Sequence, residues 1–144
     1  MLLTGTFPRT LDEKKRLVLP KRVREQLGTP SVAYVTPGPD QCLWLYSQAG
    51  LEQLALKLDE APAADAEVRV FRRLFFAQTE TVEVDRNGRV LIPERLLSFA
   101  GLKHEVMLLG VRDHLELWDA GRWHEYMSQH ASRFDAIAEG AFGK

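Results

Sequence analysis

The feature that most constrains this chain is an internal duplication. Residues 11–28 align with residues 84–101 at an offset of 73, and five aligned positions are identical. These identical pairs are Asp12/Asp85, Arg16/Arg89, Pro20/Pro93, Arg22/Arg95 and Gly28/Gly101. Apolar segments farther along recur in the same order, with 32–35 matching 106–109 and 43–46 matching 115–118. Chance similarity would not preserve the order of so many segments, so the chain is one unit used twice.

Each unit predicts the same local structure. In the second unit, residues 81–84 alternate polar and apolar side chains, which is typical of a half-buried strand. Asn87-Gly88 favours the tight turn of a hairpin, and the apolar run 90–92 predicts a buried strand. Pro93 suits the first turn of a helix and Gly101 the position just past its end. Residues 93–100, like residues 20–27, are therefore predicted to form a short helix.

A hairpin and a longer helix complete each unit. The predicted hairpin strands are 32–35 with 43–46, and 106–109 with 115–118, and Ser47 and Asp119 are good N-caps for the helices that follow. The acidic, proline-containing segment 59–67 is typical of a linker. A further helix at about 66–77 carries apolar residues on one side and arginines on the other. The segment after Arg133 is rich in Ala and Gly, and we expect it to fray.

These elements predict an α+β fold, rich in β structure, with one core. The chain has 144 residues, of which 45% are hydrophobic, but one unit of about 73 residues is too small to close its own core comfortably. We expect a single pseudo-two-fold barrel built from two strand–helix–hairpin repeats, with flanking helices. The expected divisions are 5–58 for the first repeat, 59–78 for the linker and connecting helix, 79–130 for the second repeat, and 131–144 for a flexible tail.

Positive charge is concentrated in one part of the chain. The net charge is only −1, which taken alone argues against a polyanion-binding protein. Residues 9–24, however, contain seven basic and two acidic side chains, a net charge of +5, which leaves −6 for the rest. The basic segment includes the first Asp-x-x-x-Arg motif, so the function of that motif needs explanation.

The repeated Asp-x-x-x-Arg motif connects two predicted strands in each unit and should lie at a turn on the rim of the fold. One interpretation is structural, because aspartate accepts backbone N–H bonds in turns and the arginine can pair with it. The other is functional, because a guanidinium suits phosphate oxygens or a guanine edge. In the first copy Lys14 and Lys15 lie in the same loop as Arg16, which favours a polyanion partner.

These residues resemble the MraZ family of transcriptional regulators, duplicated relatives of the AbrB/SpoVT swapped-hairpin DNA-binding fold. The resemblance covers about residues 5–126 and is carried by Leu11-Asp12…Arg16-Leu17…Pro20…Arg24, Asp85-Arg-Asn-Gly-Arg89-Val-Leu-Ile-Pro93, Val106-Met-Leu-Leu-Gly110 and Leu115-Glu-Leu-Trp118. It implies a bacterial cytoplasmic, nucleoid-associated protein that binds short direct repeats upstream of the division and cell-wall gene cluster. It also implies a ring-shaped homo-oligomer.

In the family the Asp-x-x-x-Arg loop contacts double-stranded DNA, which maps onto Asp12, Lys14, Arg16, Asp85 and Arg89. With their basic neighbours, the candidate DNA-binding residues are Arg9, Asp12, Lys14, Lys15, Arg16, Arg22, Asp85, Arg86 and Arg89. This sequence departs from the family at Lys15, where glycine is usual. Because a left-handed backbone is costly for lysine, we expect the first loop to differ in shape from the second.

Other function classes lack the residues they need. The four histidines show no metal-ligand spacing, and no nucleophile, phosphate loop or carboxylate pair indicates an enzyme, a cofactor or a small-molecule substrate. No apolar run approaches the ~20 residues of a membrane helix. We expect no secretory signal, and the lone Cys42 fits a reducing cytoplasm. The alternative function is an AbrB-like protein-interaction module such as an antitoxin, which would need a partner-binding tail beyond Arg133.

Overall fold

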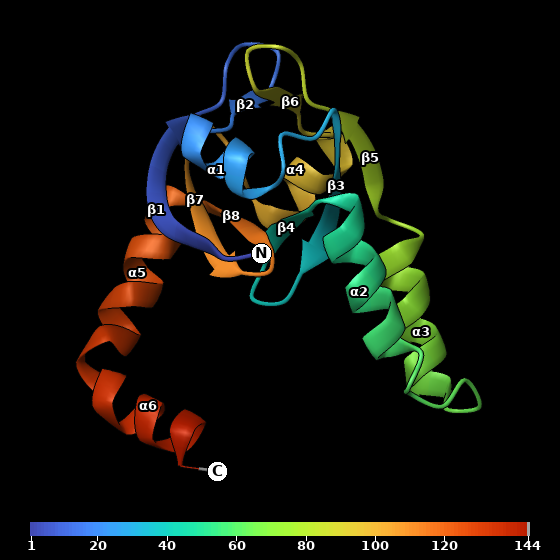
Figure 1. Cartoon of the computed structure of the whole chain (residues 1–144). Coiled ribbons are helices and arrows are strands. Elements are labelled where there is room, and N and C mark those ends of the chain that lie inside the picture. The colour runs from blue at the N-terminus through green and yellow to red at the C-terminus, as the bar shows by residue number, and fades with distance from the viewer. Residues whose placement is uncertain (144) are drawn as a thin grey trace.

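Each repeat folds into the same order of elements in the computed structural model, which describes residues 1–143 (Figure 1). The first repeat contains β1 (Leu3–Thr10), β2 (Arg16–Val18), α1 (Lys21–Gln26), β3 (Val32–Gly38), β4 (Cys42–Tyr46) and α2 (Gln48–Leu58). Helix α3 (Ala66–Phe76) leads to the second repeat. That repeat contains β5 (Glu80–Glu83), β6 (Arg89–Leu91), α4 (Glu94–Ala100), β7 (Glu105–Arg112), β8 (Leu115–Asp119) and α5 (Ala120–His130). A 3-10 turn at Ala131–Arg133 and helix α6 (Phe134–Phe142) follow.

The strands form an antiparallel sheet in the order β1-β7-β8-β4-β3-β5, and a separate two-stranded ribbon of β2 and β6. The hairpins of the two repeats meet at the centre of the sheet, where Trp44 pairs with Glu116. The first strand of each repeat pairs with the hairpin of the other repeat, β1 with β7 and β5 with β3. In the ribbon, Leu17 lies opposite Val90. The duplicated sequence therefore becomes a pseudo-two-fold arrangement of strands.

The structure does not confirm the predicted barrel. Within residues 1–143 the edge strands β1 and β5 do not pair with each other, so the six-stranded sheet stays open. At Asp12 and Asp85 each repeat makes a turn that leads from the first strand into the ribbon. The ribbon then covers one end of the sheet, and the bridge between Val84 and Val90 connects it to β5.

One hydrophobic core is shared by both repeats. Leu17 and Val90 of the ribbon are completely buried, as are Val23 of α1 and Leu96 of α4. They belong to one cluster with the leucines of the central strands, Leu43, Leu45, Leu115 and Leu117. The expectation that neither repeat closes its own core agrees with this cluster.

The helix boundaries follow the predicted signals closely. Ser47 caps α2 by accepting the backbone N–H of Gly50, and Asp119 caps α5 by accepting that of Arg122. Gly101, with a φ of 64°, ends α4 in the left-handed conformation. Pro20 and Pro93 lie at the N-caps of α1 and α4, one residue before the first turn in which we expected them.

The C-terminal segment, which we expected to fray, contains a helix. Residues 134–142 form α6, because alanines with high helix propensity outnumber the single glycine inside the helix. Figure 1 shows α5 and α6 as one arm and α2 and α3 as another, both projecting away from the end that carries β2 and β6. No helix in residues 1–143 combines the length and apolarity needed to cross a membrane.

Candidate nucleic-acid interface

The first Asp-x-x-x-Arg loop is organised by its aspartate. Asp12 Oδ1 accepts the backbone N–H groups of Lys14 at 2.9 Å and Arg16 at 2.8 Å. Asp12 Oδ2 accepts Nε of Arg16 at 2.7 Å, which forms an ion pair. This is the structural role that we expected of an aspartate in a turn, and it fixes the direction of the Arg16 side chain.

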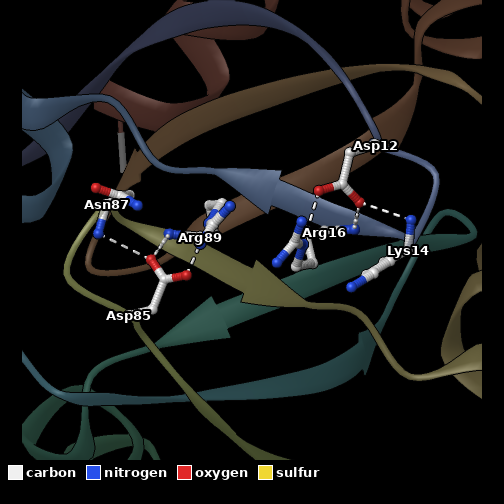
Figure 2. Close-up of polar contacts among 6 residues, drawn as sticks. All are labelled: Asp12, Lys14, Arg16, Asp85, Asn87 and Arg89. Atoms are coloured by element: carbon white, nitrogen blue, oxygen red, sulfur yellow. Dashed lines mark hydrogen bonds and ion pairs between the residues drawn. The ribbon is translucent and has the colours of Figure 1, made fainter.

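The second loop repeats this geometry. Asp85 Oδ1 accepts the backbone N–H groups of Asn87 and Arg89, both at 2.9 Å, and Oδ2 accepts Nε of Arg89 at 2.7 Å. Figure 2 shows both arginine side chains over the ribbon, between the two aspartates. Two loops that lie 73 residues apart in the sequence thus present their guanidinium groups at one end of the molecule.

Each loop is held by the other repeat. The backbone N–H of Leu19 donates to the carbonyl of Gly88 at 2.8 Å, and the N–H of Ile92 donates to the carbonyl of Lys15 at 3.0 Å. These bonds continue the pairing of β2 with β6 beyond the ribbon. The position of one loop is therefore linked to that of the other.

The prediction that Lys15 changes the shape of the first loop was wrong. Lys15 has a φ of 63° and Gly88 a φ of 78°, so both positions are left-handed. The backbone N–H of each donates to the aspartate carbonyl of its own loop, at 2.9 Å for Lys15 and 3.0 Å for Gly88. The hydrogen bonds of the loop impose the left-handed conformation on Lys15 in spite of its steric cost.

Both aspartates are held in the charged form. The backbone N–H of Arg16 is the main cause that lowers the pKa of Asp12, with further contributions from its guanidinium and from the N–H of Lys14. Arg89 and Asn87 lower the pKa of Asp85 in the same way. The loops therefore keep their ion pairs at neutral pH.

The remaining candidate residues differ in their surroundings. Lys14, Lys15 and Arg86 are exposed within the loops. Arg9 Nε donates to the carbonyl of Val18 at 3.1 Å, which places Arg9 beside β2. Arg22 instead contacts β1: its Nη2 lies 3.4 Å from the carbonyl of Thr4, and its guanidinium lies over the ring of Phe7. The structure thus gathers all the candidates except Arg22 around the ribbon.

Sequence reasoning missed Arg24 as a member of this group. Its Nη2 donates to the carbonyl of Arg86 at 3.4 Å, and a Cβ added to Gly88 would lie 2.8 Å from its Cδ. Arg24 of the first repeat therefore packs over the loop of the second repeat. The sequence signals are that Arg24 ends the basic segment 9–24 and that the second repeat has Leu97 at the equivalent position.

Acidic residues line a groove beside the ribbon. Glu80 and Glu83 of β5 lie in it together with Arg16, Arg89 and Leu91, and Glu80 lies 3.9 Å from Arg95. No corresponding acidic pair stands on β1, where Arg9 lies beside the ribbon. The side of the ribbon next to β5 is therefore more acidic than the side next to β1, although the two loops have the same shape.

The other chemically active side chains are buried away from the loops. His114 stacks against Trp44, and its ring nitrogens lie 2.8 Å from Asp113 and 2.9 Å from Glu116. Burial lowers the pKa of His114, but the hydrogen bonds to both carboxylates outweigh it, so the net shift is upward. Burial is also the main cause that raises the pKa of Cys42 to about 12. Within residues 1–143 no group of His, Cys, Asp and Glu has the arrangement of a metal site.

Comparison with known proteins assigns the family. The family model described as "MraZ protein, putative antitoxin-like" matches the chain twice, at residues 2–74 and 75–144. Proteins named transcriptional regulator MraZ from Moorella thermoacetica and Acetivibrio thermocellus are both 38% identical to it, over 138 and 135 residues. These alignments cover 96% and 94% of this chain, and 95% and 93% of the relatives. The protein named transcriptional regulator MraZ from Saccharopolyspora erythraea is 39% identical over 96% of this chain and 95% of its own length. The chain therefore belongs to the MraZ family, a family of transcriptional regulators rather than of enzymes.

Proposed function

We propose that this protein regulates transcription by binding double-stranded DNA in a sequence-specific manner through its two Asp-x-x-x-Arg loops. The observation that carries the proposal is that Arg16 and Arg89, each fixed by an aspartate, lie side by side over one ribbon. Ion pairing through Nε orients each guanidinium, and a guanidinium has further donors for phosphate or guanine. The aspartates act as positioning residues in this proposal.

The first loop carries the larger share of the affinity. Lys14 and Lys15 accompany Arg16 in a segment, residues 9–24, that has a net charge of +5, whereas the second loop has Arg86 as its single further cation. Cations that neutralise phosphates release counterions and strengthen binding at low salt, while carboxylates oppose it. We therefore propose that four basic residues bind phosphate: Lys14, Lys15, Arg22 and Arg86. Arg22 lies farthest from the ribbon, because it contacts β1.

We further propose that the protein assembles into a ring. Phe134 and Ile137 of α6 are 71% and 47% exposed, and the second arm offers an apolar groove between α2 and α3 that is lined by Leu54, Phe71 and Leu74. Helix α6 also contains the acidic residues Asp135 and Glu139, and α3 contains the basic residues Arg69 and Arg73. If α6 of one copy docks in the groove of the next, the contact is head-to-tail, and such contacts form a ring when the rotation between successive copies closes.

A ring of identical loops suits tandem repeats in DNA, because several weak contacts on one assembly raise the effective concentration. The family resemblance supplies the rest of the proposal. The repeats would lie upstream of the division and cell-wall gene cluster, and the protein would be cytoplasmic and associated with the nucleoid.

Fluorescence anisotropy on a duplex from the region upstream of its own gene tests the DNA-binding proposal. Arg16→Ala should weaken binding about tenfold or more, since a bidentate arginine contact contributes roughly 1–3 kcal/mol. Arg89→Ala should weaken it less. Arg112→Ala, at the far end of β7, is the matched control and should leave affinity unchanged. Wild-type affinity for the Arg16 variant would refute the assignment.

Light scattering after gel filtration tests the ring. Phe134→Glu and Leu74→Glu should each yield smaller species, whereas Gln129→Glu on α5 should not. Equal sizes for all four proteins would refute the proposed contact.

A protein-interaction module is the second candidate, favoured by the exposed apolar side of α6. Absence of measurable DNA binding at low salt, together with an intact fold, would select this candidate.

A further inference from the structure

The outward face of the β2–β6 ribbon carries two exposed aliphatic side chains. Leu17 and Val90 point into the core and are completely buried, whereas Val18 and Leu91 are 44% and 55% exposed. Residues 18 and 91 are equivalent positions of the duplication. Outward positions of a sheet with one buried face are usually polar, so two equivalent aliphatic residues need an explanation.

The register of the ribbon places each aliphatic residue beside an arginine. Arg16 lies opposite Leu91, and Val18 lies opposite Arg89. Side chains directly opposite in an antiparallel pair lie about 4.5–5.5 Å apart at Cβ and contact each other. The ribbon therefore presents a pattern of two guanidinium groups and two aliphatic groups, related by the pseudo-two-fold axis.

This pattern matches the chemistry of the DNA major groove. The groove is wide enough for a two-stranded ribbon, and it presents guanine acceptors for arginine and the thymine C5-methyl group for apolar side chains. The minor groove offers no methyl group. A surface that only needed to follow phosphates would gain nothing from Val18 and Leu91.

We propose that Val18 and Leu91 contact thymine methyl groups in the major groove and so determine sequence specificity next to the arginines. The inference rests on the proposed DNA-binding function and adds base recognition to it. The loops bind phosphate and orient the ribbon, and the aliphatic pair distinguishes thymine from cytosine at the contacted positions.

The two contacts should differ in strength. The carbonyl of Val18 accepts Nε of Arg9 at 3.1 Å, so a cation lies beside this end of the ribbon. Leu91 lies in the groove with Glu80 and Glu83, whose carboxylates oppose a close approach of DNA. We therefore expect Val18 to contribute more discrimination than Leu91.

The test removes the methyl groups from the DNA and the aliphatic groups from the protein. A duplex selected by the wild-type protein from a random library is the probe, and each thymine in turn is replaced by deoxyuridine. Loss of one buried methyl group should weaken wild-type binding about fourfold at the contacted positions. Val18→Ser and Leu91→Ser should bind the unmodified duplex several-fold more weakly and lose the response to deoxyuridine at their own position.

Val111→Ser is the matched control, since Val111 is a 38% exposed aliphatic residue of β7 away from the ribbon. It should retain the full response to deoxyuridine. Circular dichroism and gel filtration establish that each variant is folded and assembled like the wild type. If a serine variant does not fold, the wild-type response to deoxyuridine decides the question.

Three outcomes would overturn the inference. Wild-type binding could tolerate deoxyuridine at every position, or both serine variants could keep the wild-type response. The serine variants could also change the size of the assembly and leave discrimination intact, which would place the pair in a subunit contact. Failure of the wild-type protein to select any duplex would instead refute the proposed DNA-binding function itself.

Discussion

Lys15 allows a sharp test of how the loops are held. Its φ of 63° lies in the left-handed region, which costs an ordinary residue about 1–2 kcal/mol and glycine almost nothing. Lys15→Gly removes this cost. The greater conformational freedom of glycine in the unfolded chain offsets about 0.5–1 kcal/mol of the resulting gain in stability. We therefore expect the free energy of unfolding to rise by about 0.5–1 kcal/mol.

Urea denaturation followed by circular dichroism measures this change. Protein concentration must be equal in all samples, because assembly couples stability to concentration. Lys14→Gly is the matched control: it removes the same charge from a neighbouring exposed residue that is not left-handed. This variant should be destabilised by about 0.5–1 kcal/mol, since no strain is relieved.

Both glycine variants should bind DNA more weakly, because each loses one cation. Lys15→Gly should thus combine higher stability with lower affinity. If Lys15→Gly is no more stable than Lys14→Gly, the strain assigned to the first loop does not exist.

Three further predictions concern the packing of β1, the charges of the loop aspartates and the buried thiol. A Cβ at Gly110 would lie 2.4 Å from backbone of β1, so Gly110→Ala should destabilise the fold by about 3 kcal/mol or more in urea denaturation. Gly140→Ala in α6, where a Cβ meets nothing, should be neutral or stabilising, and equal effects of the two would contradict the packing of β1. Folding lowers the pKa of Asp12 and Asp85, so their contribution to stability is complete above the ordinary aspartate pKa and disappears as pH falls through the lowered values. Asp12→Asn and Asp85→Asn should therefore reduce the loss of stability between pH 7 and pH 3, and an unchanged loss would show that the aspartates are not responsible. The buried Cys42 thiol, with its pKa raised to about 12, should react with a thiol reagent only in denaturant, and rapid labelling of the native protein would disprove its burial.

The sequence predicted those features that depend on local chemistry. The order of elements in each repeat, the N-caps at Ser47 and Asp119, and the left-handed end of α4 at Gly101 all follow from residues close together in the chain. The role of Asp12 within its turn is of the same kind, because its partners lie two and four residues away.

The features that the sequence did not predict depend on contacts between the repeats or on hydrogen bonds that override a residue's own preference. Arg24 reaches the second loop only because the pseudo-two-fold axis brings α1 beside it. The shape at Lys15 is imposed by hydrogen bonds within the loop, which override the preference of lysine. Strand β1 extends over Leu3–Thr10 although Gly5 and Pro8 interrupt its pattern, because an edge strand tolerates proline at positions that need no donor.

The exchange of first strands between the repeats affects how the chain folds. Leu3 pairs with Arg112, so β1 has no partner until synthesis has reached the end of β7, more than one hundred residues later. Such long-range pairing slows folding, because closing a long loop costs entropy before any contact forms. A chain stopped after the first repeat would expose an unpaired β1 and the edge of β3 that normally pairs with β5. Two such fragments could then pair through these exposed strand edges. Because both repeats belong to one chain, β1 and β5 pair with the opposite repeat within the same molecule. This strand pairing therefore does not depend on protein concentration.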